Sequence, residues 1–119
     1  MSELNEFLSQ ELPAFLAAVK YDFEQPVVVL QVVVPGHREL RTHYQLTAQG
    51  VTARSDLSEV APDVTLAIQL PELEQLRSHS LNLREAIVLG RIQLFGDPHV
   101  AQRLGRLLSG SNLWGAPAP

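Results

Sequence analysis

Hydrophobic residues at the start of the chain recur every three or four positions, a spacing typical of one face of an amphipathic helix. The stripe consists of Leu4, Phe7, Leu8, Leu12, Phe15, Leu16 and Val19. Ser2 is available as an N-cap, and acidic residues occupy the first turn. Pro13 lies inside the stripe and has no amide hydrogen, so we expect the helix to kink or to restart at this residue.

The next segment shows the patterns of β-strands. Residues 27–34 form a β-branched run in which Gln31 is the single polar residue, which predicts a central strand covered on both faces. After a Pro-Gly turn, hydrophobic and polar residues alternate, which predicts a strand with one solvent-facing side. Its inward positions are Leu40, Thr42, Tyr44, Leu46 and Ala48. A Gln-Gly turn then leads to a short third strand at residues 51–54, so this half of the sheet is expected to be antiparallel.

The second half of the chain predicts two strands joined by two short helices. Val64, Leu66, Ile68 and Leu70 form the inward face of a fourth strand, after which Pro71 opens a helix. The stripe of that helix continues through two further leucines.

Capping residues mark the remaining elements. Asn82 and Glu85 form a capping box for the second short helix, which Gly90 ends. Residues 91–95 predict the fifth strand, and Asp97 caps a last helix that begins with a proline. The buried stripe of this helix is expected to contain Val100, Leu104, Leu107 and Leu108.

Length and composition indicate one folded domain. The 119 residues suit a single domain, which we place at residues 1–110, with a flexible C-terminal tail at 111–119. Hydrophobic residues make up 45% and charged residues 18%, values typical of globular domains. The formal net charge of -4 argues against nucleic-acid binding, and the absence of cysteine excludes disulfides and thiolate chemistry. No apolar run, Val27–Leu30 included, is long enough to cross a membrane, and the acidic start does not resemble an export leader, so we expect a cytoplasmic protein.

The sequence offers no clear catalytic or metal-binding group. His37 and His43 would lie about 20 Å apart on an extended strand, too far to share an ion. His79 and His99 lack partners at ligand spacing, so we predict no metal and no cofactor. Neither a nucleophile elbow nor a phosphate-binding loop occurs, and we therefore expect a protein that is not an enzyme.

One segment resembles a known family. The residues that carry the resemblance are Asp63–Ile68, Leu73, Leu76, Ala86 and Gly90–Asp97. In their order and spacing they resemble the sterol carrier protein type 2 family. The resemblance implies an α+β fold with a five-stranded, mostly antiparallel sheet, helices packed on one face, and an apolar tunnel for lipids. It also leaves Gly96 and Asp97 with structural roles, in a turn and as a helix cap.

If such a tunnel exists, its walls should come from the hydrophobic face of the sheet and from the helices. The predicted lipid-binding residues are Phe15, Leu16, Leu66, Ile68, Leu73, Leu76, Leu83, Ile87, Leu94, Leu104, Leu108 and Trp114. Among them, Leu104, Leu108 and Trp114 are expected to form a movable gate, because Ser109-Gly110-Ser111 can hinge. For each of these residues, ordinary core packing is at least as good an interpretation, and it is the better one for the strand residues.

Three functions are compatible with this pattern. The leading hypothesis is non-enzymatic binding or transfer of a sterol, fatty acyl or isoprenoid lipid, with transient membrane contact. The second is a bacterial accessory domain that presents ubiquinone precursors to membrane-associated enzymes. The third is an interaction module with a filled core that homodimerises through the last helix or Trp114. A void of a few hundred cubic ångströms favours the carrier, and a filled core favours the module.

Overall fold

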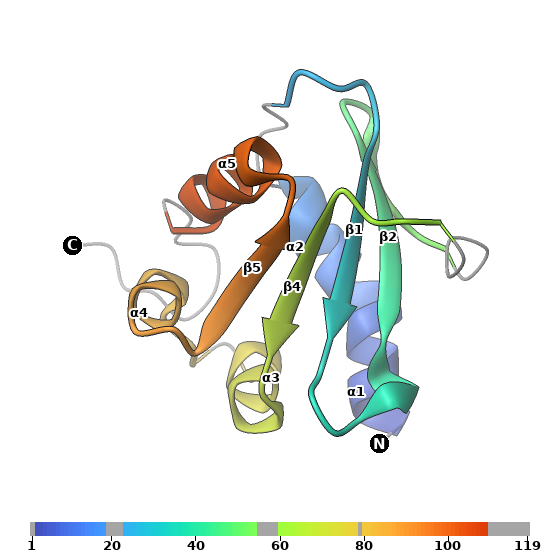
Figure 1. Ribbon diagram of the computed structural model, residues 1–119. Helices are drawn as coiled ribbons and strands as arrows, with labels where there is room; N and C mark the ends of the chain where they lie inside the picture. The colour runs from blue at the N-terminus through green and yellow to red at the C-terminus, as the bar shows by residue number, and fades with distance from the viewer. Residues whose placement is uncertain (1, 19–22, 55–59, 79, 110–119) are drawn as a thin grey trace.

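Five strands form one mixed sheet, in the order β3-β2-β1-β4-β5 (Figure 1). The computed structural model describes residues 2–18, 23–54, 60–78 and 80–109. The strands are β1 (Val28–Val33), β2 (Thr42–Thr47), β3 (Gly50–Ala53), β4 (Val64–Ile68) and β5 (Ile92–Gly96). β1 pairs with β4 in parallel, and the other neighbouring strands are antiparallel. The predicted five-stranded, mostly antiparallel sheet is confirmed.

The helices lie before, between and after these strands. They are α1 (Ser2–Glu6), the π-helix η1 (Phe7–Glu11), α2 (Leu12–Ala18), the 3₁₀-helix η2 (Arg38–Leu40), α3 (Leu70–Arg77), α4 (Leu83–Val88) and α5 (Pro98–Ser109). In Figure 1 the α1–η1–α2 segment runs behind β1 and β2. α2 packs on β3, α5 packs on β4 and β5, and α4 packs on α5. The helices thereby enclose a hydrophobic interior against the sheet.

Alternation along β1 defines the face of the sheet that the helices cover. Val28, Leu30 and Val32 are buried, whereas Val29 and Gln31 are half-buried. The central position of this strand is confirmed, but the expected burial of both faces is wrong. The hydrophobic core, which includes the helical residues, lies on the Leu30 side, and the β-branched residues on the other side are only partly shielded.

The N-terminal helix changes its hydrogen-bonding pattern just before Pro13. The amide of Leu12 donates to the carbonyl of Phe7, five residues back, and α-helical geometry resumes at Leu12. The restart expected at Pro13 is therefore observed one residue earlier. The first six residues of the predicted stripe are buried, while Val19 and the side chain of Ser2 lie outside the described residues.

All five strands differ from the prediction by a residue or two at their ends, and two of these differences have a clear local cause. β2 begins at Thr42 because residues 38–40 form η2, although Leu40 is buried as expected. Leu70 belongs to the first turn of α3 rather than to β4, since the proline that follows it favours the first turn of a helix.

The predicted caps at Asn82, Gly90 and Asp97 are confirmed. Asn82 Oδ1 accepts the amide of Glu85 at 3.0 Å, and Gly90, with φ +76°, follows the end of α4. Asp97 Oδ1 accepts the amides of His99 at 2.9 Å and Val100 at 3.4 Å, which caps the start of α5.

Asp63 joins three segments of the sheet. Its carboxylate Oδ2 accepts the amide of Val29 at 2.7 Å, and its own amide donates to the carbonyl of Val29 at 2.9 Å. The Asp63 carbonyl accepts the amide of Asp97 at 2.9 Å. Gly96 has φ +117°, and a Cβ there would lie 2.5 Å from the Asp63 carbonyl oxygen. The Gly-Asp pair thus has the structural role that was expected, because only glycine fits this close approach.

Candidate functional site

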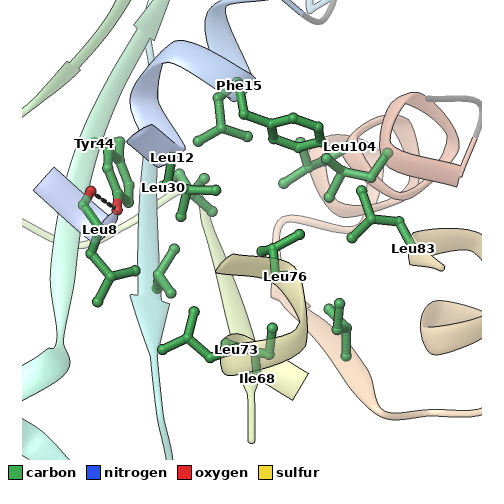
Figure 2. Close-up of a cluster of buried hydrophobic side chains, with 14 of the residues drawn as sticks. Leu8, Leu12, Phe15, Leu30, Tyr44, Ile68, Leu73, Leu76, Leu83 and Leu104 are labelled. Atoms are coloured by element: carbon green, nitrogen blue, oxygen red, sulfur yellow. Dashed lines mark hydrogen bonds between the residues drawn. The ribbon is translucent and has the colours of Figure 1, made fainter. Parts of the chain in front are cut away.

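An apolar cavity lies between the sheet and the helices. Its twelve lining side chains are all hydrophobic. They come from strands β1, β4 and β5 and from helices α2, α3, α4 and α5. They are Leu12, Phe15, Leu16, Leu30, Val32, Leu66, Ile68, Leu73, Leu76, Leu83, Ile92 and Leu108. Figure 2 shows Phe15, Leu76 and Leu83 reaching from three helices toward this common interior. Such a surface offers apolar contact and no general acid, base or metal ligand.

Eight of the predicted lipid-binding residues line this cavity. They are Phe15, Leu16, Leu66, Ile68, Leu73, Leu76, Leu83 and Leu108. Leu104 is buried in the core without lining the cavity, and Ile87 and Leu94 pack partly buried against the core. Trp114 and the hinge at Gly110 and Ser111 lie outside the described residues, so the proposed gate stays a prediction.

Four lining residues were missed by the sequence interpretation. They are Leu12, Leu30, Val32 and Ile92. Each was recognised as part of a helix stripe or a strand, but nothing local distinguishes a core residue that faces a void from one that faces a neighbour. The strand register would have identified two of them, because each lies opposite a residue that was predicted. Val32 lies opposite Leu66, and Ile92 lies opposite Ile68.

The cavity is small. Its volume is about 20 Å³, enough for about one water molecule, whereas sites for small molecules measure about 300–1,000 Å³. The tunnel implied by the family resemblance is therefore not present as free space at this position. By the volume criterion given above, an interior this small favours the filled-core module, so a carrier function requires the interior to open. A lipid would enter only if the helices move away from the sheet.

A buried hydrogen bond supports one side of this interior. The Tyr44 hydroxyl donates to the backbone carbonyl of Leu8 in η1 (Figure 2). In a π-helix the carbonyl of Leu8 would pair with the amide of residue 13, but Pro13 has no amide hydrogen. Burial raises the pKa of the Tyr44 phenol well above its usual value, so it stays protonated as a donor.

The histidines differ in their surroundings. His43 was placed on the solvent-facing side of its strand, yet it is only 5% exposed. Burial, and secondly the charge of Arg41, lower its pKa, so it is neutral near pH 7. His37 Nδ1 lies 3.3 Å from a Glu39 carboxylate oxygen. A backbone hydrogen bond, and to a smaller extent His37, lower the pKa of Glu39.

Two further findings concern the described parts of the chain. Within them, no three histidine or acidic side chains come close enough to form a metal-binding group. No helix in the same ranges has the length and hydrophobicity needed to cross a membrane.

The apolar stripe of α5 is not a free surface. Val100, Leu104 and Leu108 are each 2% exposed, because α5 packs on β4, β5 and α4. Homodimerisation through this stripe, one form of the interaction-module hypothesis, is therefore incompatible with the fold. The alternative route through Trp114 lies outside the described residues.

The fold is that of sterol carrier protein 2 structures. The crystal structure of Sterol Carrier Protein 2 Like 2 from Aedes aegypti is 20% identical, with a TM-score of 0.58 over 89% of this chain and 97% of that chain. A solution NMR structure of palmitated SCP2L2 from Aedes aegypti is also 20% identical, with a TM-score of 0.56 over 87% of this chain and 92% of that one.

The same fold occurs as part of a larger protein. A double mutant of the sec-alkyl sulfatase PisA1 is 22% identical, with a TM-score of 0.54 over 91% of this chain and 17% of its own length. No curated protein sequence matches the chain. The sequence model of the SCP-2 sterol transfer family matches residues 22–109. The chain therefore belongs to the SCP-2 sterol transfer family.

Proposed function

We propose that this protein binds a lipid with a long apolar chain in the interior between the sheet and the helices, and transfers it without catalysis. The observation that supports this most directly is the interior whose lining is entirely hydrophobic and drawn from β1, β4 and β5 as well as from α2, α3, α4 and α5. Membership of a sterol transfer family supports the same class of ligand.

Binding requires the interior to open. The strand residues of the lining are held by ladder hydrogen bonds, whereas α3 and α4 are short helices that contribute Leu73, Leu76 and Leu83. Outward movement of these helices enlarges the cavity without breaking the sheet. Burying about twelve methylenes contributes about 10 kcal/mol before the costs of opening and ordering are subtracted. That is enough to offset a modest loss of packing.

A fatty acid is the first ligand to test. The palmitated protein from Aedes aegypti has a similar fold, which supports this choice of probe. A sterol and an isoprenoid quinone precursor are the other two classes suggested by the resemblance, so all three are compared. Binding of the quinone precursor alone would favour the accessory-domain function over general lipid transfer.

The test is a titration of the delipidated full chain with a fluorescent fatty acid, together with native mass spectrometry. We expect saturable binding and a one-to-one adduct. If none of the three ligand classes binds and no lipid is extracted from freshly purified protein, the carrier function is overturned and the filled-core module is favoured.

Two matched variants locate the ligand. Leu66 is half-buried and lines the cavity, so Leu66→Phe fills the space and should weaken binding about tenfold. Ile87 is also half-buried but does not line the cavity, so Ile87→Phe should bind normally. Equal effects of the two substitutions would place the ligand elsewhere.

A further inference from the structure

A second hollow, on the surface of the protein, is lined by three arginines. It has a volume of about 410 Å³, and we call it the arginine pocket. Its lining residues are Ser9, Arg38, Arg41, Thr42, His43, Ala53 and Arg54. None of them lines the apolar cavity, so the two sites are separate.

The fold brings these arginines together from two segments. The amide of Arg41 donates to the carbonyl of Arg38 at 3.1 Å, in the 3₁₀ turn of η2. Side chains three residues apart in such a turn project on the same side. Pairing of β2 with β3 brings the third arginine near, because the amide of Arg54 donates to the carbonyl of His43 at 2.9 Å. The pocket therefore depends on tertiary structure.

The pocket concentrates positive charge on a chain with a net charge of -4. Among the residues that the structure describes, no carboxylate lines the pocket, and Arg38 and Arg41 form no ion pair. The adjacent acid, Glu39, is engaged by His37. A neighbouring hollow of about 230 Å³ is also lined by Arg38 and Arg41, so both side chains border open space.

Two hydroxyl groups of the pocket donate to backbone carbonyls of their own segments. The Ser9 hydroxyl donates to the Glu6 carbonyl at 3.3 Å, and the Thr42 hydroxyl donates to the Leu40 carbonyl at 3.1 Å. Arg54 Nη1 donates to Gln45 Oε1 at 2.8 Å, which holds that side chain beside the pocket. His43 lines the pocket as a nearly buried imidazole.

From this arrangement we infer that the arginine pocket binds a phosphate group. Guanidinium groups match the oxygens of phosphate through paired hydrogen bonds, and several around one hollow suit a group with more than one negative charge. The phosphate comes either from the headgroup of an acidic phospholipid or from a small phosphorylated molecule in solution. Both sources present the same oxygens to the arginines.

The experiment titrates the full chain with glycerol 3-phosphate at constant ionic strength. NMR of the His43 ring monitors the titration. Saturable binding should raise the pKa of His43, because a nearby anion favours its protonated form. Arg38→Gln combined with Arg41→Gln should weaken binding at least about tenfold. Arg84→Gln removes an exposed arginine on α4, outside the pocket, and should leave binding unchanged.

A vesicle arm distinguishes the two sources. Vesicles of phosphatidylcholine, with and without phosphatidylglycerol, are compared for sedimentation of the wild type and the double variant. Arginine-dependent binding to the acidic vesicles, with glycerol 3-phosphate competing, supports a headgroup; binding of the free phosphate alone supports a soluble ligand. The inference is overturned if neither binds, or if the folded double variant binds as well as the wild type.

Discussion

The hydroxyl of Tyr44 on β2 donates a hydrogen bond to the backbone carbonyl of Leu8 in η1, at an Oη–O distance of 2.5 Å. Both residues are buried, and the bond ties the N-terminal helix to the sheet. The carbonyl is available because Pro13 cannot supply the amide that a π-helix would use at this position. The Tyr44 hydroxyl thus supplies the hydrogen-bond donor that Pro13 lacks.

Replacing Tyr44 by phenylalanine should destabilise the protein by about 1–3 kcal/mol, because the Leu8 carbonyl stays buried without its donor. Pro13→Ala supplies an amide at position 13, so in that background the cost of Tyr44→Phe should fall. Urea denaturation of the four proteins in this double-mutant cycle measures the coupling. Strictly additive effects would contradict the compensation.

Gly96→Ala should be much more damaging than an alanine at another glycine with positive φ. At Gly96 the new Cβ would lie 2.5 Å from the Asp63 carbonyl oxygen, in addition to the strain of φ +117°. We expect a loss of about 3 kcal/mol or more, against about 1 kcal/mol for Gly36→Ala, which meets nothing within 4 Å. Thermal unfolding monitored by circular dichroism provides the comparison, and similar losses for both would refute the close-approach explanation.

Asp63→Ala should cost about 1.5–3 kcal/mol, because the amide of Val29 loses its charged acceptor. Asp63→Asn keeps an acceptor oxygen and should cost less. Hydrogen exchange of the Val29 amide reports on the bond itself, so exchange should accelerate in the alanine variant. An unchanged exchange rate would show that the carboxylate does not protect this amide.

The free energy of unfolding should decrease as the pH is lowered, and His43 should account for part of this decrease. Its pKa in the folded protein is lowered from 6.5, so below pH 6.5 the unfolded chain takes up a proton that the native protein does not. The free energy of unfolding therefore decreases as the pH falls through this value, and the decrease ends below the pKa of the folded state. Denaturation between about pH 7.5 and about pH 5 should show a smaller decrease for His43→Gln than for the wild type. A phosphate-free buffer avoids occupying the arginine pocket, and parallel pH profiles would rule out this role for His43.

Local chemistry determined much of what the sequence predicted correctly. The caps at Asn82 and Asp97 depend on residues a few positions away, and the burial of Tyr44 and Leu46 follows from the period of the strand. The size of the cavity could not be predicted, because it depends on how leucines from separate elements pack against one another.

The arginine pocket was missed for a related reason. Arg41 and Arg54 are neighbours only because β2 and β3 pair, and the alternating pattern placed His43 in solvent although the folded chain buries it. Contacts between segments that are distant in sequence are thus the part of the site that a single sequence does not reveal.

The most direct test of the lipid-binding proposal is isotope-filtered NMR of the ¹³C-methyl-labelled full chain with an unlabelled fatty acid. We predict nuclear Overhauser contacts from the acyl chain to the methyl groups of Leu73, Leu76 and Leu83, which line the interior from α3 and α4. Contacts confined to exposed methyl groups such as those of Val88, or no contacts at saturating ligand, would contradict binding between the sheet and the helices.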